Sequence, residues 1–261
     1  HRGPASARTA DRGVGLRQPL KTTERLVLSF IIPAHDEESG IETTIRCVRD
    51  SASTAGVPYE VIVVDDGSAD RTGAVAASAG AQVLRTESRQ IAAARNAGAA
   101  AARGDILVFV DADTLIHAAV VRAVVATIRD GAVGGGVGVR FDEPIPVYVK
   151  VAAPAFAWLM RHVRLAYGCF LFCTRRAFDA AGGFDERLFA SEEIALSLAL
   201  KRQGPFTILR DTVLSSGRKF RTYTVPEILR RLVRLAWAGT GALGDRRLLD
   251  FWYAPRRKDP S

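Results

Sequence analysis

A run of five apolar residues, 106–110, leads directly into the acidic segment Asp111-Ala112-Asp113. An unbroken apolar run of this length is typical of a central strand that is covered on both faces. Open α/β sheets bind ligands beyond the carboxyl ends of such strands, and two carboxylates one residue apart can hold a hard divalent cation through oxygen. The segment therefore predicts a metal or nucleotide site. The alternative is that Asp113 or Thr114 caps a helix that begins near Leu115.

Acidic residues also follow two earlier predicted strands. Apolar, β-branched runs predict strands at residues 26–32, 59–64 and 82–85, with helical patterns between them. Such alternation predicts a parallel sheet with right-handed crossovers, so the loops after its strands meet at one edge. The acids that follow three of the strands are Asp36 and Glu37, Asp65 and Asp66, and Asp111 and Asp113. Their convergence favours a ligand site over a helix cap.

Local patterns predict the other elements. Ser39 and Glu42 have the spacing of a capping box for a helix that ends near residue 55. Residues 132–141 predict a strand whose triplet Gly134-Gly135-Gly136 marks a bulge or a close backbone approach. Residues 144–165 have no clear assignment. Further helices are expected at residues 90–102, 115–129 and 191–203, and further strands at 167–174, 206–210 and 212–214.

The length of 261 residues is enough for one large α/β domain, and the basic charge lies at its two ends. The net formal charge is +8, but residues 1–26 carry +4 and residues 214–261 carry +7, so the middle is mildly acidic. We therefore expect a disordered basic leader (1–25), a catalytic domain (26–217) and a basic helical extension (218–261). Three cysteines make no disulfide framework, which is typical of a cytoplasmic protein.

Residues 224–237 predict an amphipathic helix within this extension. Its apolar side chains recur at helical spacing, and its arginines lie mostly on the other side. These are Ile228, Leu229, Leu232, Leu235 and Ala236 on one side, and Arg230, Arg231 and Arg234 on the other. The helix either packs its apolar side on the catalytic domain or lies on an anionic membrane surface, at the inner face of the cell membrane. Nucleic acid is not an expected partner, because few aromatic residues interleave with the basic ones.

Several motifs in this order resemble those of a family 2 glycosyltransferase with the GT-A fold. The first strand continues into Pro33-Ala34-His35-Asp36-Glu37, and the second into Asp65-Asp66-Gly67-Ser68. Ala94-Arg95-Asn96-Ala97-Gly98 precedes Asp111-Ala112-Asp113, which has the form of the family's Asp-x-Asp motif. Gly182-Gly183-Phe184-Asp185-Glu186, followed by Glu192-Glu193, is similar to its late acidic motif.

The resemblance implies an α/β GT-A fold, a Rossmann-like mixed sheet flanked by helices. It implies a transferase that moves a sugar with inversion from a nucleotide-diphosphate sugar, expected to be UDP-linked, to the hydroxyl of an acceptor. That acceptor would be a glycan, a lipid-linked molecule or a small molecule. A divalent cation, Mn²⁺ or Mg²⁺, would be held by Asp113 and Asp111. The donor-binding residues would be Pro33, Ala34, His35, Glu37, Asp65, Asp66, Arg95, Asp111, Ala112 and Asp113.

The general base of the family corresponds to Glu193 here, with Glu192 as its neighbour. Both acids also suit a structural role in the first turn of a helix, and Arg95 also suits a place on a helix surface. The chain has Glu193 where the family has aspartate, and His35 where many members have tyrosine. In place of a late histidine ligand it offers Arg218 or Lys219 to offset diphosphate charge.

Two other functions remain open. A sugar-nucleotide-binding module without catalysis would keep the donor aspartates and lack a usable base. A nucleotidylyltransferase would need a glycine-rich basic loop after the first strand, and Pro33-Ala34-His35-Asp36 does not have that composition. The presence of Glu193 favours the transferase.

Overall fold

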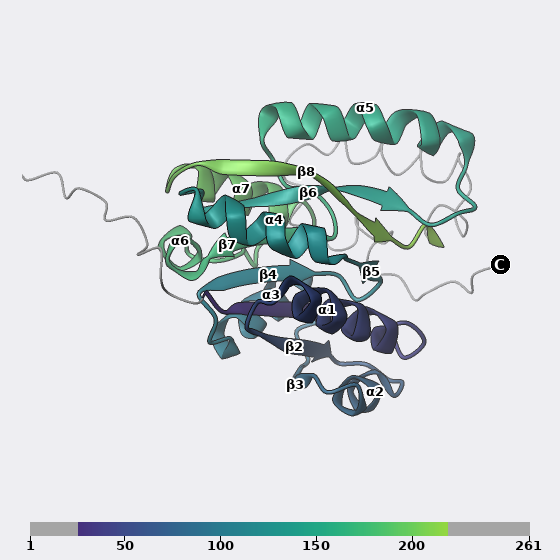
Figure 1. The fold of residues 1–261 in the computed structure, drawn as a ribbon. Coiled ribbons are helices and arrows are strands. Elements are labelled where there is room, and N and C mark those ends of the chain that lie inside the picture. Colours follow the sequence, from purple (N-terminus) through teal and green to yellow (C-terminus); the bar gives the residue numbers. More distant parts are fainter. Residues whose placement is uncertain (1–25, 219–261) are drawn as a thin grey trace, which may run out of the picture.

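In a computed structural model, which describes residues 26–218, the chain forms one eight-stranded sheet covered by helices on both faces (Figure 1). The strands are β1 (Leu28–Ala34), β2 (Tyr59–Asp66), β3 (Gln82–Thr86), β4 (Ile106–Val110), β5 (Thr114–Leu115), β6 (Gly134–Phe141), β7 (Phe170–Thr174) and β8 (Phe206–Ser215). The helices are α1 (Ile41–Ala55), α2 (Thr72–Ser78), α3 (Ile91–Ala101), α4 (Ala118–Arg129), α5 (Val147–Val163), α6 (Arg175–Ala181) and α7 (Glu192–Lys201).

The strand order is β3-β2-β1-β4-β7-β6-β8-β5. The first four strands are parallel, whereas β7 is antiparallel to both β4 and β6, and β5 is antiparallel to β8. The expected mixed α/β sheet is thus confirmed. Parallel strands place their carboxyl ends at one edge, which brings the loops after β1, β2 and β4 together.

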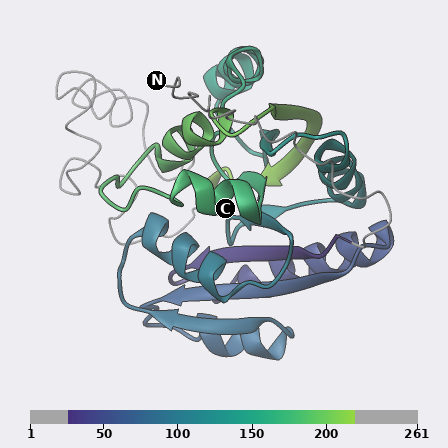
Figure 2. The same ribbon diagram turned by 90° about the vertical axis from the view of Figure 1, so that its left-hand side faces the viewer.

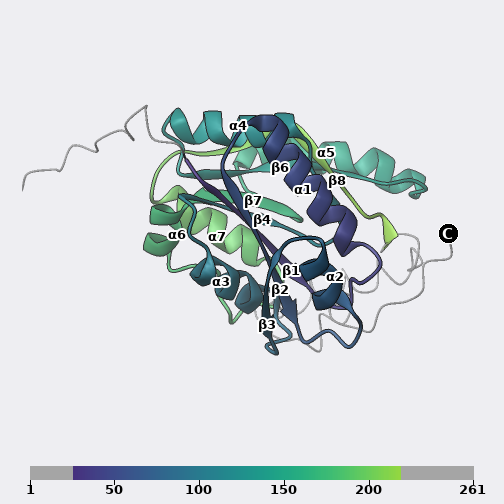
Figure 3. The same ribbon diagram turned by 60° about the horizontal axis from the view of Figure 1, so that its bottom comes forward.

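The core consists of two apolar layers, one on each face of the sheet. Side chains alternate along the strands, so Phe30 and Ile32 of β1 face α1 and α4, whereas Ile31 faces α3. Figure 3 shows α1 and α4 on one face and α3, α6 and α7 on the other. The approach of α3 is close, because a Cβ at Gly98 would lie only 3.0 Å from Val64 Cγ2.

Two local expectations at helix and strand ends are wrong, and one alternative is excluded. Helix α1 has Gly40 as its N-cap without a side-chain hydrogen bond, so Ser39 and Glu42 do not form a capping box. Neither Asp113 nor Thr114 caps a helix, because Thr114 is paired in β5 and α4 begins only after His117. Residues 206–210 and 212–214 belong to one strand, β8, which crosses an irregularity in its pairing with β6.

The glycine triplet lies in β6, between β7 and β8. A Cβ at Gly134 would approach the Phe172 carbonyl oxygen to 2.7 Å, and the register with β8 shifts between Gly136 and Gly138. The close backbone approach and the bulge are therefore both confirmed. The unassigned residues 144–165 contain the 17-residue helix α5.

The leader at 1–25 and the amphipathic pattern at 224–237 lie outside the described residues. None of the helices between residues 26 and 218 has both the length and the apolar character needed to cross a membrane.

Candidate active site

The Asp111-Ala112-Asp113 turn is fixed by contacts from three elements. The Asp111 amide donates a hydrogen bond to the Cys169 carbonyl oxygen beside β7 (3.1 Å). Thr44 Oγ1 of α1 donates to the Ala112 carbonyl oxygen (2.8 Å), and Ser215 Oγ of β8 approaches Asp113 Oδ1 to 3.4 Å. The two carboxylates therefore sit on a turn that the core holds in place at the carboxyl end of β4.

The Arg95 guanidinium joins this turn to the start of α7. Its Nη2 lies 2.9 Å from Asp111 Oδ1, and its Nη1 lies 2.9 Å from Glu192 Oε1 and 3.2 Å from Glu193 Oε1. The side chain is only 2% exposed, which excludes the alternative of a helix-surface arginine. One buried cation thus binds three carboxylates that come from distant parts of the sequence.

Burial and charge shift the pKa values in this cluster in different directions. Burial alone would lower the pKa of Arg95, but Glu193, Asp111 and Glu192 raise it above its ordinary value, so the guanidinium stays charged. For Glu193, burial raises the pKa, Arg95 lowers it, and Glu192 and Asp111 raise it again, to about 7. A carboxyl group with this pKa exchanges protons near neutral pH.

The first residues of α7 direct both acids towards Arg95. Ser191 precedes the helix in the left-handed region, with φ 62°, and makes no side-chain cap. Such a backbone conformation is costly for a residue other than glycine, and it is often retained where it orients functional groups. The Glu192 side chain is 4% exposed and that of Glu193 is 14% exposed, so Glu193 is the more accessible of the two.

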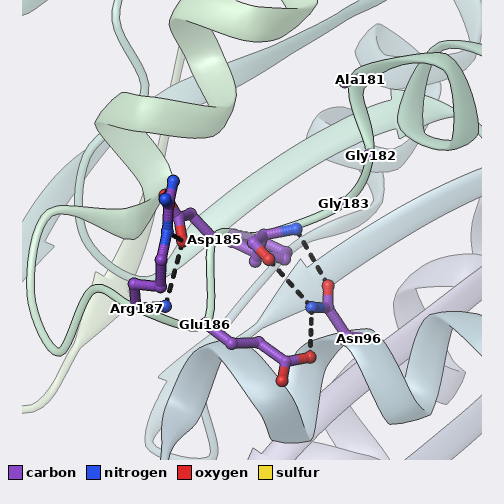
Figure 4. A pocket seen from close by; sticks show the side chains of 8 residues that line it. Asn96, Ala181, Gly182, Gly183, Asp185, Glu186 and Arg187 are labelled. Carbon is purple, nitrogen blue, oxygen red and sulfur yellow. Dashed lines mark hydrogen bonds and ion pairs between the residues drawn. The ribbon is translucent and has the colours of Figure 1, made fainter.

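A neighbouring loop, residues 182–187, supports the cluster from the side of α3. Asn96 Nδ2 donates to the Phe184 carbonyl oxygen (2.9 Å) and to Glu186 Oε1 (2.8 Å), and the Phe184 amide donates back to Asn96 Oδ1 (2.9 Å). Figure 4 shows these hydrogen bonds beside a surface pocket that Asp185 and Arg187 also line. These hydrogen bonds hold Phe184, whose ring centroid lies 5.2 Å from Arg95 Cζ. At this distance the face of the ring stabilises the buried positive charge.

The loops after β1 and β2 are joined by hydrogen bonds. The Asp36 amide donates to Ser68 Oγ (3.0 Å), and Asp36 Oδ1 accepts from the Ala69 amide (2.8 Å). His35 Nδ1 lies 2.8 Å from the Asp66 carbonyl oxygen. Asp36 has φ 51°, a second left-handed residue in the loops at this edge. Pro33 and Ala34 are the last residues of β1, paired with Val64 and Asp65.

Asp66 organises the segment that connects β3 to α3. Its Oδ1 accepts hydrogen bonds from Thr86 Oγ1 and Ser88 Oγ, and its Oδ2 accepts from the Gln90 amide, each at 2.9 Å. Asp65 Oδ1 accepts from the Ser68 amide, and Asp65 Oδ2 lies 3.8 Å from Arg85 Nε. Both carboxylates are buried, so each has a structural role whatever it binds.

The end of β8 returns to the loop after β1. Arg218 Nη2 lies 3.6 Å from the buried Glu37 carboxylate, and the Glu37 amide donates to Thr72 Oγ1 (2.8 Å). The predicted residues thus form three linked groups, which are His35 with Asp66, Glu37 with Arg218, and Arg95 with Asp111, Glu192 and Glu193. The sequence assigned no role to Ser215, Phe184 or Asn96. The only signal for Phe184 and Asn96 was that each lies within a motif of the family.

The oxygen donors of this turn suit a hard cation. Asp111 and Asp113 are both partly exposed, and Mg²⁺ or Mn²⁺ commonly binds one or two carboxylates together with substrate phosphates. In the described part of the chain, no three histidine, cysteine or acidic side chains are grouped as a complete metal site. Two carboxylates on one turn fit a cation that binds substrate phosphates as well.

Comparisons with known proteins identify the family and the fold. Residues 29–175, more than half of the chain, match the family model "Glycosyl transferase family 2". Over 107 residues the chain is 38% identical to a dolichyl-phosphate beta-glucosyltransferase of Drosophila melanogaster, which covers 36% of this chain and 33% of the relative. The chain thus spans about a third of the length of this curated relative.

Two solved structures share the fold. The mannosyltransferase PcManGT of Pyrobaculum calidifontis, in complex with GDP-Man and Mn²⁺, matches with a TM-score of 0.63 at 18% identity, over 91% of this chain and 67% of that one. Glucosyl-3-phosphoglycerate synthase of Mycobacterium tuberculosis, in complex with Mn²⁺, UDP and phosphoglyceric acid, matches with a TM-score of 0.53 at 25% identity, over 80% of this chain and 76% of that one.

Proposed function

Because the chain belongs to glycosyl transferase family 2 and is thus a nucleotide-sugar-dependent transferase, we propose that it moves a sugar from a UDP-linked donor to an acceptor hydroxyl. The observation that carries this proposal is the link from Asp111 through Arg95 to Glu193. It places a carboxyl group with a pKa of about 7 beside the turn that would hold the donor diphosphate. A pKa near the working pH is suited to a general base.

The proposed reaction is a single displacement. Glu193 accepts the proton of the acceptor hydroxyl, whose oxygen forms a bond to the anomeric carbon of the donor. The bond from that carbon to the diphosphate oxygen breaks on the opposite side, so the configuration inverts and the electron pair leaves with the nucleoside diphosphate. Arg95 is a positioning residue, because its Nη atoms bind the carboxylates on both sides of the site.

Asp111 and Asp113 would hold the divalent cation, Mn²⁺ or Mg²⁺. When bound, the cation offsets the negative charge that the leaving diphosphate gains. Arg218, which lies 3.6 Å from the Glu37 carboxylate, would offset part of the remaining charge.

The nucleotide would lie against the loops after β1 and β2. Pro33, Ala34 and His35 would contact it from β1 and the loop that follows, and Asp65 and Asp66 from the end of β2, because β1 and β2 pair up to Ala34 and Asp65. The linked loops support this placement, since a ligand at this edge contacts both at once. Glu37 and Ala112 complete the proposed donor site from either side.

Replacing Asp66 with alanine is expected to weaken nucleotide binding even without metal. The change removes the acceptor of three hydrogen bonds, so we also expect a loss of about 1–3 kcal/mol in the free energy of unfolding, which thermal denaturation would measure. Titration of UDP in the presence of a chelator would measure the affinity, with Asp50→Ala on the exposed side of α1 as a matched control. Unchanged UDP affinity in a folded variant would remove Asp66 from the donor site.

A panel of nucleotide sugars tests the function as a whole. UDP-linked and GDP-linked sugars are added with and without Mn²⁺ or Mg²⁺, and the shift in unfolding temperature reports binding, because a ligand of the native state stabilises it. Transfer of a labelled sugar then separates a transferase from a sugar-nucleotide-binding module. We expect a metal-dependent shift with a UDP-sugar and formation of product. A larger shift with GDP-sugars would overturn the UDP assignment alone.

The acceptor is proposed as a glycan, a lipid-linked molecule or a small molecule with a free hydroxyl. One relative acts on a lipid phosphate by its name, and another solved structure holds phosphoglyceric acid. A lipid-linked acceptor would suit an enzyme located at the inner face of the cell membrane, the location that we propose.

A further inference from the structure

Helix α5 presents large apolar side chains to solvent along most of its length. Val147, Val151 and Trp158 are 75%, 72% and 66% exposed, and Val149 is its only fully buried residue within the described chain. The three exposed residues recur at helical spacing, so they form one apolar face that points away from the sheet. Tyr148 and Leu159 follow on one flank of this face, whereas Phe156 and Val163 lie on the side of the helix nearer the domain, with the buried Val149.

Few contacts attach α5 to the domain. Arg161 Nη2 donates a hydrogen bond to the Leu209 carbonyl oxygen of β8 (3.0 Å), and Lys150 Nζ lies 2.7 Å from Glu143 Oε1. The Phe156 ring packs edge-on against Tyr167, with 5.0 Å between ring centroids. Figures 1 and 2 show α5 at the rim of the molecule, beyond β6 and β8. These contacts hold α5 on the domain with Val147, Val151 and Trp158 exposed.

The charges on α5 are of one sign. Residues 147–163 include Lys150, Arg161 and His162 and contain no acidic residue, and Arg164 follows directly. Tryptophan and tyrosine favour the boundary between headgroups and acyl chains, and basic residues are attracted to anionic lipids. We propose that α5 lies in the plane of an anionic membrane surface and inserts its apolar face, with Trp158 at the headgroup boundary.

Like charges argue against the two other occupants of this face. A second copy of the chain would bring two sets of Lys150, Arg161 and Arg164 together. The amphipathic pattern at 224–237 carries three arginines and one acidic residue, so it offers the basic residues of α5 little opposite charge. An anionic lipid surface is complementary to both segments. The proposal does not depend on the proposed function, because binding to lipid is measured without turnover.

Co-sedimentation of the full chain with vesicles gives the first test. The parent should bind vesicles that contain phosphatidylglycerol, bind neutral phosphatidylcholine vesicles weakly, and lose affinity as salt is raised. Val151→Ser combined with Trp158→Ser should reduce the affinity at least about tenfold, because two exposed apolar side chains no longer insert. Leu198→Ser, at an exposed apolar residue of α7, is the matched control and should bind like the parent.

Both α5 positions are largely exposed, so the double variant should keep the parental unfolding temperature, which is checked first. Equal binding of the parent and the double variant overturns the proposal, and so does a parent that binds neither kind of vesicle. A dimer that the double variant abolishes, measured by sedimentation velocity without lipid, would assign the face to a second copy.

Fluorescence of Trp158 gives the second test. The chain has three tryptophans, so Trp237→Phe with Trp252→Phe leaves Trp158 as the only one. We expect its emission to be that of an exposed indole in buffer and to shift to the blue with anionic vesicles. An emission that is already blue in buffer and does not change with lipid would mean that another part of the chain covers α5, and would overturn the proposal.

Discussion

Replacing Asp113 with alanine is expected to abolish turnover and to remove the metal dependence of nucleotide binding. Asp113 is one of two carboxylates on the turn after β4, and it is the one that Arg95 does not bind. Without Asp113, Asp111 is the one carboxylate on this turn that can bind a cation. Its Oδ1 already accepts a hydrogen bond from Arg95. The leaving diphosphate would then lack the charge that offsets it.

Two measurements check this expectation. Isothermal titration of UDP with and without Mn²⁺ should show a metal-dependent gain for the parent and none for the variant, and product formation should fall below detection. Asp130→Ala, at the exposed C-cap of α4, is the control for the loss of one surface carboxylate. If Asp113→Ala still transfers sugar at the parental rate with Mn²⁺, the metal site lies elsewhere.

The elements that form the donor edge were predictable because their sequence patterns are local. Residues 106–110 form the predicted strand with the same limits, since a strand buried on both faces admits only apolar side chains. The acids at or just beyond the ends of β1, β2 and β4 lie at one edge of the sheet because these strands are parallel neighbours. Each of these inferences needed only a short window of sequence and a general rule of sheet topology.

The role of Arg95 could not be derived in this way. Its alanine-rich helix has no strong apolar periodicity, so the sequence left open whether the residue faces solvent or the interior. Its partners Glu192 and Glu193 are 97 and 98 residues away in the chain, and only the packing of α7 against the same face of the sheet brings them together. Contacts over such a distance depend on the arrangement of the second half of the sheet, which local patterns do not specify.

Helix α5 shows a second limit of inference from sequence, which concerns burial. Its residues are apolar on several sides, and an apolar segment in a soluble domain is ordinarily assigned to the core. Because Val147, Val151 and Trp158 are exposed, the rule that relates an apolar pattern to burial fails for this helix. A failure of this kind is expected where a surface has a binding role, since the interaction partner is absent from the pattern of the chain alone.

Replacing Glu193 with glutamine is expected to lower kcat by about a hundredfold or more, with donor affinity little changed. The amide oxygen can still accept the hydrogen bond from Arg95, so the position of the side chain is kept while its capacity to take a proton is lost. Steady-state rates and UDP-sugar affinity are compared with those of Glu42→Gln, which removes an exposed carboxylate from α1. A variant with near-parental kcat would transfer the role to Glu192 or to another acid.

The pH dependence gives an independent readout of the same residue. Burial, opposed by Arg95 and supported by Glu192 and Asp111, raises the pKa of Glu193 to about 7, so the carboxyl group is protonated below this pH and cannot act as a base. The kcat/KM of the parent should therefore fall about tenfold per unit as the pH drops below 7 and level off above it, because this ratio reports the free enzyme. In Glu193→Gln this dependence should disappear. If the acid limb persists unchanged in the variant, it belongs to another group, and Glu193 is not the base.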